Sequence, residues 1–216
     1  MDPRLKDIPL FSGIDDSRLE VLSDVARKKT YPKNTVLCSE GDIGESLYII
    51  CRGKVKVTMN DDEGKEIILS MLGPGEYFGE MALLDREPRS ATVITKEPTE
   101  VMIITRKDFL ELFSPNAVEL NLLKGLTKRL REANRKIESL ALLDVYGRIA
   151  RLLNQLAKAR GDVLVVDEKL THQEIAKMIG SSREMVSIIL KELSTGGFIS
   201  IDKKQITIHK KLPCTW

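Results

Sequence analysis

Residues 171–193 read THQEIAKMIGSSREMVSIILKEL, two apolar helical repeats separated by a glycine and two serines. Thr171 precedes Glu174 by three positions, which is the capping-box pattern at the start of a helix. The helix that starts there is expected to end at Gly180, and a second helix is expected over 182–193. Two helices joined by a tight turn that contains glycine form a helix-turn-helix.

The segments on either side of this motif complete a small domain. Residues 198–201 and 205–209 have the pattern of two strands joined in a hairpin, in the position of a wing. Upstream, Asp144 is a candidate N-cap for a helix over 146–159. Residues 144–216 are therefore predicted to form a winged helix-turn-helix domain.

Residues 108–143 have the period of one long helix. Apolar residues recur in it at intervals of three and four, which is the heptad spacing of a coiled coil. They are Leu123, Leu126, Leu130, Ala133, Ile137 and Leu140. Because the stripe is narrow and the helix is too long for one small domain to cover, we expect it to pair with the same helix of a second chain. A helix packed only on its own domain would also need an apolar stripe and stays the alternative.

Residues from about 30 to 105 alternate short apolar runs with turn formers, which is typical of a β-sandwich or small barrel. Residues 54–59 alternate strictly between polar and apolar, as a half-buried strand requires. A short helix over 15–27 is expected before them. The other predicted strands are 36–38, 47–51, 67–72, 91–94 and 101–104. Strands followed by helices predict an α+β chain.

Composition and charge fit a globular protein with one basic end. Hydrophobic residues make up 42% and charged residues 31% of the chain. Residues 1–144 carry 22 basic and 25 acidic side chains, whereas residues 145–216 carry 12 and 7. The basic excess at the C-terminal end predicts binding to a polyanion there.

Several classes of protein are disfavoured. No apolar run is long enough to span a membrane and residues 1–10 lack the pattern of a secretion signal, so a cytoplasmic protein is expected. Three widely spaced cysteines indicate neither a disulfide framework nor a zinc ribbon. They are Cys38, Cys51 and Cys214. The two histidines, His172 and His209, are scattered, and without a paired base and nucleophile we expect no enzyme.

Four patches in order resemble the cAMP receptor protein (catabolite activator) family of bacterial transcription regulators, within the Crp/Fnr superfamily. They are GD, LYI and GKV at 41–42, 47–49 and 53–55; FGEMAL and PRSAT at 78–83 and 88–92; LALLDVYGRIA at 140–150; and residues 171–193. The resemblance covers nearly the whole chain. It implies a jelly-roll-like cyclic-nucleotide-binding β-roll over 1–107, a dimerisation helix over 108–143 and a winged helix-turn-helix DNA-binding domain over 144–216.

Residues 78–92 resemble the phosphate-binding cassette of cyclic-nucleotide-binding domains. By that resemblance, backbone N–H groups near Gly79 would approach the ligand closely, because glycine has no side chain to block them. Glu80 would accept a hydrogen bond from the ribose 2′-hydroxyl, and Arg89 would donate to the phosphate oxygens. Met81 and Ser90 complete the predicted set. A structural ion pair between Glu80 and Arg89 is the alternative.

The base of the effector is less closely determined. The family places two adjacent hydroxyl residues of the long helix against adenine, and Ala133 and Asn134 hold those positions here. Ala133 has no hydrogen-bonding side chain, whereas Asn134 can donate and accept. We expect cAMP, with cGMP, cyclic di-GMP or no effector left open. Oxygen sensors of the wider family carry a cysteine cluster for iron and sulfur, and its haem sensors use a histidine of the effector domain. Here no cysteine precedes Cys38 and no histidine lies outside the C-terminal segment, so the resemblance implies no iron–sulfur cluster, haem or other metal.

The helix over 182–193 is expected to enter the major groove of double-stranded DNA. Arg183 can donate two hydrogen bonds to guanine, and Glu184 can accept one from cytosine. Further predicted DNA contacts are Thr171, His172, Ser182, Ser187, Lys191, Lys203 and Lys204. The family's second arginine falls at Ile188, so we expect a palindromic target with relaxed preference at one base.

The resemblance also implies a mechanism and partners. A ligand that touches the long helix would shift the helix pair, and residues 143–145 would pass the shift to the two recognition helices. The expected partners are a second copy of the chain, double-stranded DNA, a cyclic nucleotide and RNA polymerase. A DNA-binding protein without a ligand, whose barrel serves only as a scaffold, is a further alternative.

Overall fold

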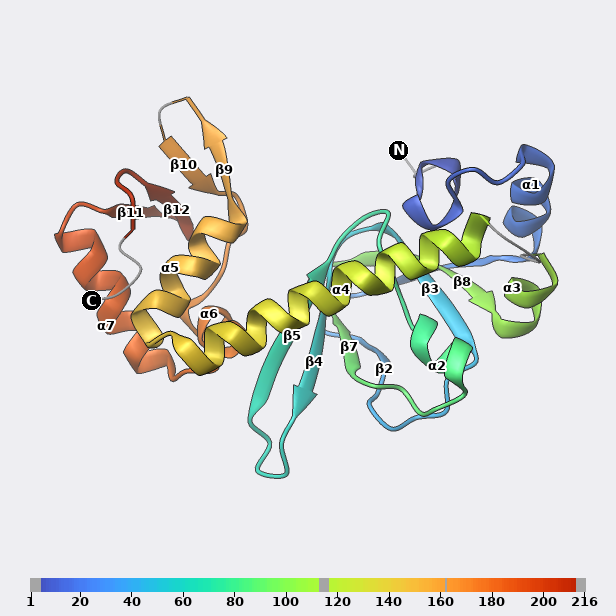
Figure 1. Cartoon of the computed structure of the whole chain (residues 1–216), viewed down its shortest axis with the longest axis horizontal. Helices are drawn as coiled ribbons and strands as arrows, with labels where there is room; N and C mark the ends of the chain where they lie inside the picture. Colours follow the sequence, from blue (N-terminus) through green and yellow to red (C-terminus); the bar gives the residue numbers. More distant parts are fainter. Residues whose placement is uncertain (1–4, 113–116, 162, 213–216) are drawn as a thin grey trace. The chain divides into compact units, whose positions relative to one another are not determined.

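The computed structural model describes residues 5–112, 117–161 and 163–212, which belong to two compact units (Figure 1). The first unit is Met1–Leu130 and the second is Arg131–Trp216. The division falls inside the longest helix, α4 (Ala117–Leu142). The three-part division at residues 107 and 143 stays a prediction.

The first unit contains two four-stranded antiparallel sheets with short helices around them. One sheet has the strand order β1-β8-β3-β6 and the other β2-β7-β4-β5. The strands are β1 (Arg27–Tyr31), β2 (Val36–Cys38), β3 (Ser46–Arg52), β4 (Val55–Asn60), β5 (Glu66–Leu72), β6 (Tyr77–Phe78), β7 (Thr92–Thr95) and β8 (Thr99–Thr105). The helical segments are η1 (Leu5–Asp7), η2 (Pro9–Phe11), α1 (Asp16–Val25), α2 (Glu80–Asp85) and α3 (Arg106–Leu112). The predicted α+β architecture with a β-sheet domain is confirmed.

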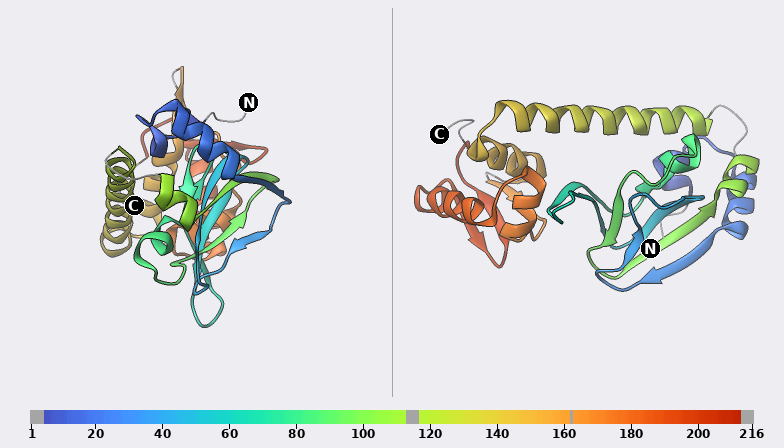
Figure 2. Two further views of the ribbon diagram at one scale, coloured as in Figure 1. Left: turned by 90° about the vertical axis from the view of Figure 1, so that its right-hand side faces the viewer. Right: turned by 90° about the horizontal axis from the view of Figure 1, so that it is seen from below.

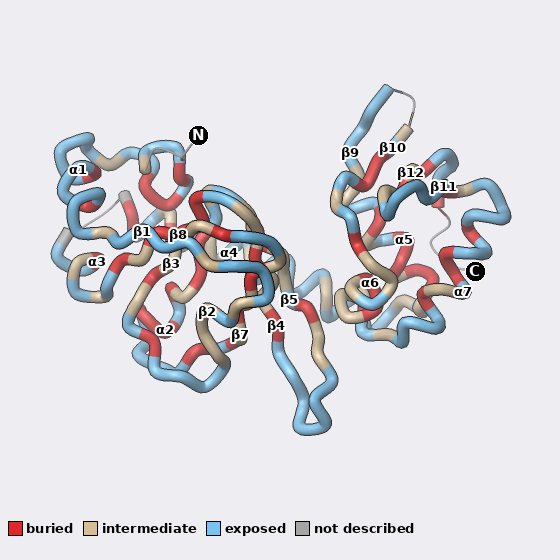
Figure 3. Tube along the Cα trace, turned by 180° about the vertical axis from the view of Figure 1, so that it is seen from behind, coloured by how far each residue is buried: buried red, intermediate tan, exposed pale blue. Residues whose placement is uncertain are grey.

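The strand β3 contributes buried residues to the core of the first unit on both of its faces (Figure 3). Leu47, Ile49 and Cys51 join a buried cluster with residues of the surrounding helices. Ile50 joins a second cluster that contains residues of both sheets. Because successive side chains of a strand point to opposite faces, a strand that is covered on both faces has an almost continuous apolar sequence.

The strand β1 was not predicted from the sequence. Its residues read RKKTY and four of the five are exposed. It lies at the edge of its sheet and, among the described strands, pairs with β8 alone. An edge strand that is open to solvent needs no apolar alternation, so the pattern used to find strands is missing.

The helix expected over 108–143 is two helices in the structure. The first, α3, ends at Leu112, and the second, α4, begins at Ala117; residues 113–116 lie outside the described part of the chain. Pro115 belongs to the segment between them. Proline disfavours helical backbone in the preceding residue and lacks a backbone N–H, so a helix begins more readily after it than across it. From Ala117 onward α4 is unbroken (Figure 2).

The faces of α4 are divided between the chain's own core and solvent. Val118 and Leu122 are buried in the first unit and Leu126 packs partly against the same cluster. The other five residues of the predicted seam are exposed instead: Ala133, Leu123 by 60%, Leu130 by 62%, Ile137 by 64% and Leu140 by 44%. A helix that packs on its own domain therefore accounts for only one face, and the seam is left uncovered in a single chain.

The second unit contains α5 (Val145–Leu156), α6 (His172–Ile179), α7 (Arg183–Thr195) and a four-stranded antiparallel sheet of order β11-β12-β10-β9. Its strands are β9 (Ala157–Arg160), β10 (Val163–Val166), β11 (Ile199–Asp202) and β12 (Gln205–Ile208). The capping box of α6 is present, with Thr171 accepting from the Glu174 backbone N–H. Gly180 follows in the left-handed conformation, with φ 64. The predicted helix-turn-helix and the hairpin after it are confirmed.

The predicted helix over 146–159 is too long. It ends at Leu156, and the next four residues form β9, which pairs with β10. In turn β10 pairs with β12, with Leu164 opposite Ile208. Alanine, lysine and arginine in residues 157–160 favour a helix locally, but the hydrogen-bonded ladder to β10, the next strand along the chain, outweighs a preference of a few tenths of a kcal/mol per residue, roughly.

The structure predicts that Asp144 stabilises the second unit as an N-cap. Its Oδ1 accepts from the backbone N–H of Gly147 at 2.7 Å. Asp144→Ala removes that acceptor and should lower the free energy of unfolding by about 1 kcal/mol, whereas Asp144→Asn keeps an acceptor and should have a much smaller effect. Thermal unfolding followed by circular dichroism measures both variants. Equal melting temperatures for the Ala and Asn variants would contradict the capping role.

Candidate functional site

Gly79 stands at the junction of β6 and α2. Its φ of 86 lies in the left-handed region, where residues with a Cβ are strained. A Cβ at this position would lie closer than 3.0 Å to the Arg89 guanidinium and to the backbone oxygen of Ser46. Both the turn and the close approach of Arg89 therefore require glycine here.

Arg89 lies inside the first unit, with only 6% of its surface exposed. Its Nη1 donates to the backbone oxygen of Gly79 and its Nη2 to that of Ser46, each at 2.8 Å. Its guanidinium carbon lies 5.7 Å from the ring centre of Tyr48, which stacks on Phe78. Both hydrogen-bond acceptors are neutral carbonyl groups, so they orient the guanidinium without neutralising its charge. Such a group is ready to bind an anion.

Glu80 is the most deeply buried charged residue of the site, with 2% of its surface exposed. Its Oε1 forms an ion pair with Nη1 of Arg129. Its Oε2 is buried and has no hydrogen-bond partner among the described residues. A buried carboxylate oxygen without a donor is costly, so this position suits a ligand that brings a hydroxyl group.

The ion pair between Glu80 and Arg89, which the sequence left open, is not the one that forms. Glu80 pairs with Arg129 instead, 49 residues further along the chain. Arg129 also donates from Nη2 to the backbone oxygen of Tyr77, and its guanidinium lies 4.9 Å from the centre of that ring. Reasoning from the sequence missed Arg129 because it is one of several charged residues flanking the apolar stripe of α4.

Burial changes the ionisation of the groups around this site. It raises the pKa of the Tyr77 phenol, and the positive charge of Arg129 opposes the rise. It likewise raises the pKa of Tyr48 and of the Cys38 thiol, in both cases against the charge of Arg89. These groups remain protonated at neutral pH, so the charges at the site come from Glu80 and the two arginines.

The remaining predicted effector residues lie at the surface. Met81 is 45% exposed in the first turn of α2, and Ser90 Oγ donates to its sulfur at 3.6 Å. Ala133 and Asn134 are exposed on the segment of α4 that belongs to the second unit. Their contact with a base stays a prediction.

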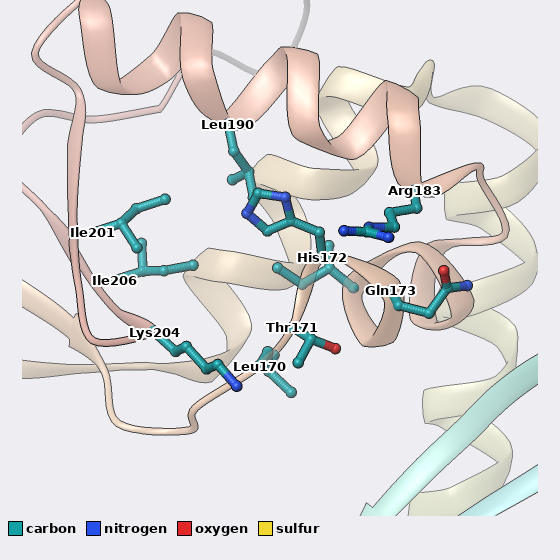
Figure 4. A pocket seen from close by; sticks show the side chains of 10 residues that line it. Leu170, Thr171, His172, Gln173, Arg183, Leu190, Ile201, Lys204 and Ile206 are labelled. Carbon is teal, nitrogen blue, oxygen red and sulfur yellow. The ribbon is translucent and has the colours of Figure 1, made fainter.

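The predicted DNA-binding residues belong to α6 and α7 with their N-caps and to the β11–β12 hairpin. Four of them, Thr171, His172, Arg183 and Lys204, line a hollow of about 430 Å³ (Figure 4). Apolar residues of the hairpin and of α7 line it as well. Ser182, Arg183, Glu184, Lys191 and Lys203 are exposed. Lys203 and Lys204 have φ of 44 and 70, so the tip of the hairpin is a tight turn that presents two lysines.

Some of the predicted phosphate contacts also have structural roles. The Thr171 hydroxyl donates to the Glu174 carboxylate at 3.0 Å and accepts from the Glu174 backbone, so capping uses its one hydrogen. The Ser187 hydroxyl donates to the backbone oxygen of Arg183 and lies 2.8 Å from Nδ1 of His172. Ser182 accepts from the Met185 backbone N–H as the N-cap of α7. The Thr171 bonds fix the start of α6, and the Ser182 bond fixes the start of α7, the predicted recognition helix.

Two apolar residues share the exposed surface of α7. Met185 is 42% exposed and Ile188 is 52% exposed, one turn apart. Ile188 holds the position where the family has a second arginine. The relaxed preference at one base that is expected from Ile188 stays a prediction.

Within the described part of the chain, no cluster of three or more His, Cys, Asp or Glu side chains could hold a metal ion. Over the same residues, no helix combines the length and the apolar character needed to cross a bilayer.

Two family profiles match the chain. The profile described as "Cyclic nucleotide-binding domain" matches residues 28–116, which include Glu80 and Arg89. The profile described as "Crp-like helix-turn-helix domain" matches residues 147–211.

Curated relatives match over nearly the whole chain. The chain is 33% identical to the cyclic AMP receptor protein of Thermus thermophilus over 208 residues, covering 95% of this chain and 94% of that protein. It is 40% identical to the cAMP-activated global transcriptional regulator CRP of Haemophilus influenzae over 184 residues, covering 83% of this chain and 82% of that protein.

Solved structures share the fold. The c-di-GMP responsive global regulator CLP of Xanthomonas campestris matches with a TM-score of 0.79 at 29% identity, covering 91% of this chain and 100% of that one. The catabolite activator protein of Thermus thermophilus matches with a TM-score of 0.56 at 33% identity, covering 93% of each chain.

Proposed function

The chain belongs to the Crp/Fnr family of cyclic-nucleotide-binding, DNA-binding transcription regulators, and on that basis we propose that it acts as a homodimer whose affinity for a palindromic operator is set by cAMP. The observation that carries the proposal is the buried carboxylate of Glu80. One of its oxygens is paired with Arg129 and the other has no donor among the described residues.

A cyclic nucleotide offers the two groups that this site lacks. Its ribose 2′-hydroxyl can donate to Oε2 of Glu80, which satisfies the buried oxygen. Its phosphodiester carries one negative charge, which Arg89 can neutralise. Gly79 has no side chain to cover the backbone near these two residues, so a ligand can approach the backbone closely.

The names of the relatives favour cAMP as the effector. Those matched over most of the chain are called cAMP receptors or cAMP-activated regulators. Cyclic di-GMP is the second candidate, because the similar regulator CLP is described as responsive to it. The replacement of the family's adenine-binding hydroxyl residues by Ala133 and Asn134 leaves room for that second candidate.

The uncovered seam of α4 supports the homodimer. A row of large apolar side chains along a helix is costly in water and is buried by pairing with an identical row. Pairing through α4 would bring together two copies of the DNA-binding unit, as a palindromic operator requires. RNA polymerase as a partner and a cytoplasmic location belong to the same proposal, since the relatives are transcription regulators.

Control by the ligand would pass along α4. The middle of this helix carries Arg129, which touches Glu80, and the helix ends at Leu142, just before the N-cap Asp144 of α5. A change at Glu80 would shift the helix pair and, through residues 143–145, the spacing of the two recognition helices. Half-sites one helical turn apart can be read only at the right spacing.

The effector claim is tested by removing the charge that should meet the phosphate. Arg89→Gln should weaken cAMP binding about a hundredfold, because two hydrogen bonds to a charged group are lost. Isothermal titration calorimetry with cAMP, cGMP and cyclic di-GMP measures the effect. Arg86→Gln, at an exposed position nearby, is the matched control and should bind like the unchanged chain. Equal losses in both variants, or heat from none of the three nucleotides, would contradict the proposal.

Two variants test the proposed DNA binding, one at a residue that should contact bases and one at a residue that should contact the DNA phosphates. Arg183→Ala should cost about 1–3 kcal/mol on the preferred operator and relax the choice of one base in each half-site. Lys203→Ala should weaken binding to all sequences alike and reduce the salt dependence by about one ion. Selection from a random DNA library, followed by titrations at several salt concentrations, measures both. An Arg183→Ala variant that keeps the full sequence preference would count against this assignment.

A further inference from the structure

We infer that the contact between Tyr77 and Gly125 positions Arg129 on Glu80, and thereby sets how strongly the chain recognises the ribose 2′-hydroxyl. The inference rests on the proposed function and deepens it. Neither residue touches the proposed ligand; both act through Arg129, so they are positioning residues.

Gly125 allows α4 to lie against the Tyr77 hydroxyl. A Cβ built on Gly125 would lie closer than 3.0 Å to the phenolic oxygen, and 3.4 Å from the ring carbon that carries it. Real Cβ atoms do not approach oxygen so closely, so the ring and a larger residue cannot both occupy this place. Glycine is also among the least favourable residues inside a helix, and Gly125 lies well within α4. The close packing of Tyr77 supplies a physical reason for it.

Tyr77 is itself held firmly. It is 8% exposed and belongs to the buried cluster that includes Leu122 of α4. Its backbone pairs with Ile49 of β3 in the sheet. Because the sheet and the core hold the ring in place, the residue at position 125 sets how closely α4 can approach the ring. That distance in turn sets the position of the next turn of α4.

That next turn carries Arg129, four residues after Gly125 and therefore on the same face of the helix. Its guanidinium lies over the Tyr77 ring, and it donates to the Tyr77 backbone oxygen and to Oε1 of Glu80. One turn of α4 thus packs against Tyr77 through Gly125 at one end and Arg129 at the other. The contacts of Arg129 also fix the orientation of the Glu80 carboxylate, whose other oxygen is the proposed acceptor for the ribose hydroxyl.

A methyl group at Gly125 should push α4 away from the ring and draw Arg129 from Glu80. The measurement that isolates this effect is the ratio of the affinity for cAMP to the affinity for 2′-deoxy-cAMP. The two ligands differ only in the 2′-hydroxyl. In the unchanged chain cAMP should bind more tightly by about tenfold or more, the value of a hydrogen bond to a charged group. In Gly125→Ala this preference should fall to about twofold or less, since the carboxylate is no longer held in place.

Rescue distinguishes positioning from a general loss of structure. Tyr77→Phe removes the oxygen that the new methyl group meets, so the double variant Gly125→Ala/Tyr77→Phe should regain most of the preference for cAMP. Thr127→Ala, at an exposed position of the same helix, is the control for an added alanine and should keep the full preference. Calorimetry with both nucleotides on all four proteins measures the ratios.

The possible results test the positioning role of Tyr77 and Gly125 separately from the proposed function. A preference for cAMP that survives in Gly125→Ala, or that stays lost in the double variant, overturns the positioning role of Tyr77 and Gly125 while the proposed function stands. Absence of binding of either nucleotide to the unchanged chain overturns the proposed function and this inference together. Loss in the single variant with recovery in the double variant is the result that we expect.

Discussion

The carboxylate of Glu80 lies almost wholly out of water, and a buried charge is unfavourable unless an opposite charge and hydrogen bonds compensate for it. Arg129 provides that compensation on one oxygen only. Because Arg129 belongs to α4, the requirement of this one carboxylate ties the long helix to the β-sheet domain. The other oxygen has no donor among the described residues and is the proposed acceptor for a ligand, so the constraint that holds the helix is also part of the proposed binding site.

The long helix then has three tasks on two of its faces. One face packs Val118 and Leu122 into the core of the first unit and, further along the helix, carries Arg129 to Glu80. The other face leaves Leu123, Leu130 and Ile137 open to solvent, where a second copy can cover them. A ligand that alters the contact at Glu80 therefore acts on an element that also forms the proposed dimer seam, and no separate relay is required.

Local signals made much of this fold predictable. The capping box at Thr171, the glycine turn and the strand signal of 54–59 are patterns of neighbouring residues, and each element appears in the structure. The burial of β4 does not alternate strictly, because the register shifts between Val57 and Thr58, so that Thr58 is buried and Met59 is exposed. What the sequence did not reveal depends on distant partners. Arg129 meets Glu80 only after the helix packs on the sheet, and β1 lacks alternation because it is an exposed edge. Gly125 was not singled out because its significance lies in Tyr77, on another element.

The central claim is that nucleotide binding and DNA binding are coupled in one molecule. Coupling is reciprocal, so it is tested most directly by two titrations of the full chain: a selected operator with and without saturating cAMP, and cAMP with and without the operator. We expect both affinities to rise by the same factor, within about 5- to 150-fold. Affinity for the operator that does not change with cAMP, or a factor that differs between the two titrations, would contradict the coupling.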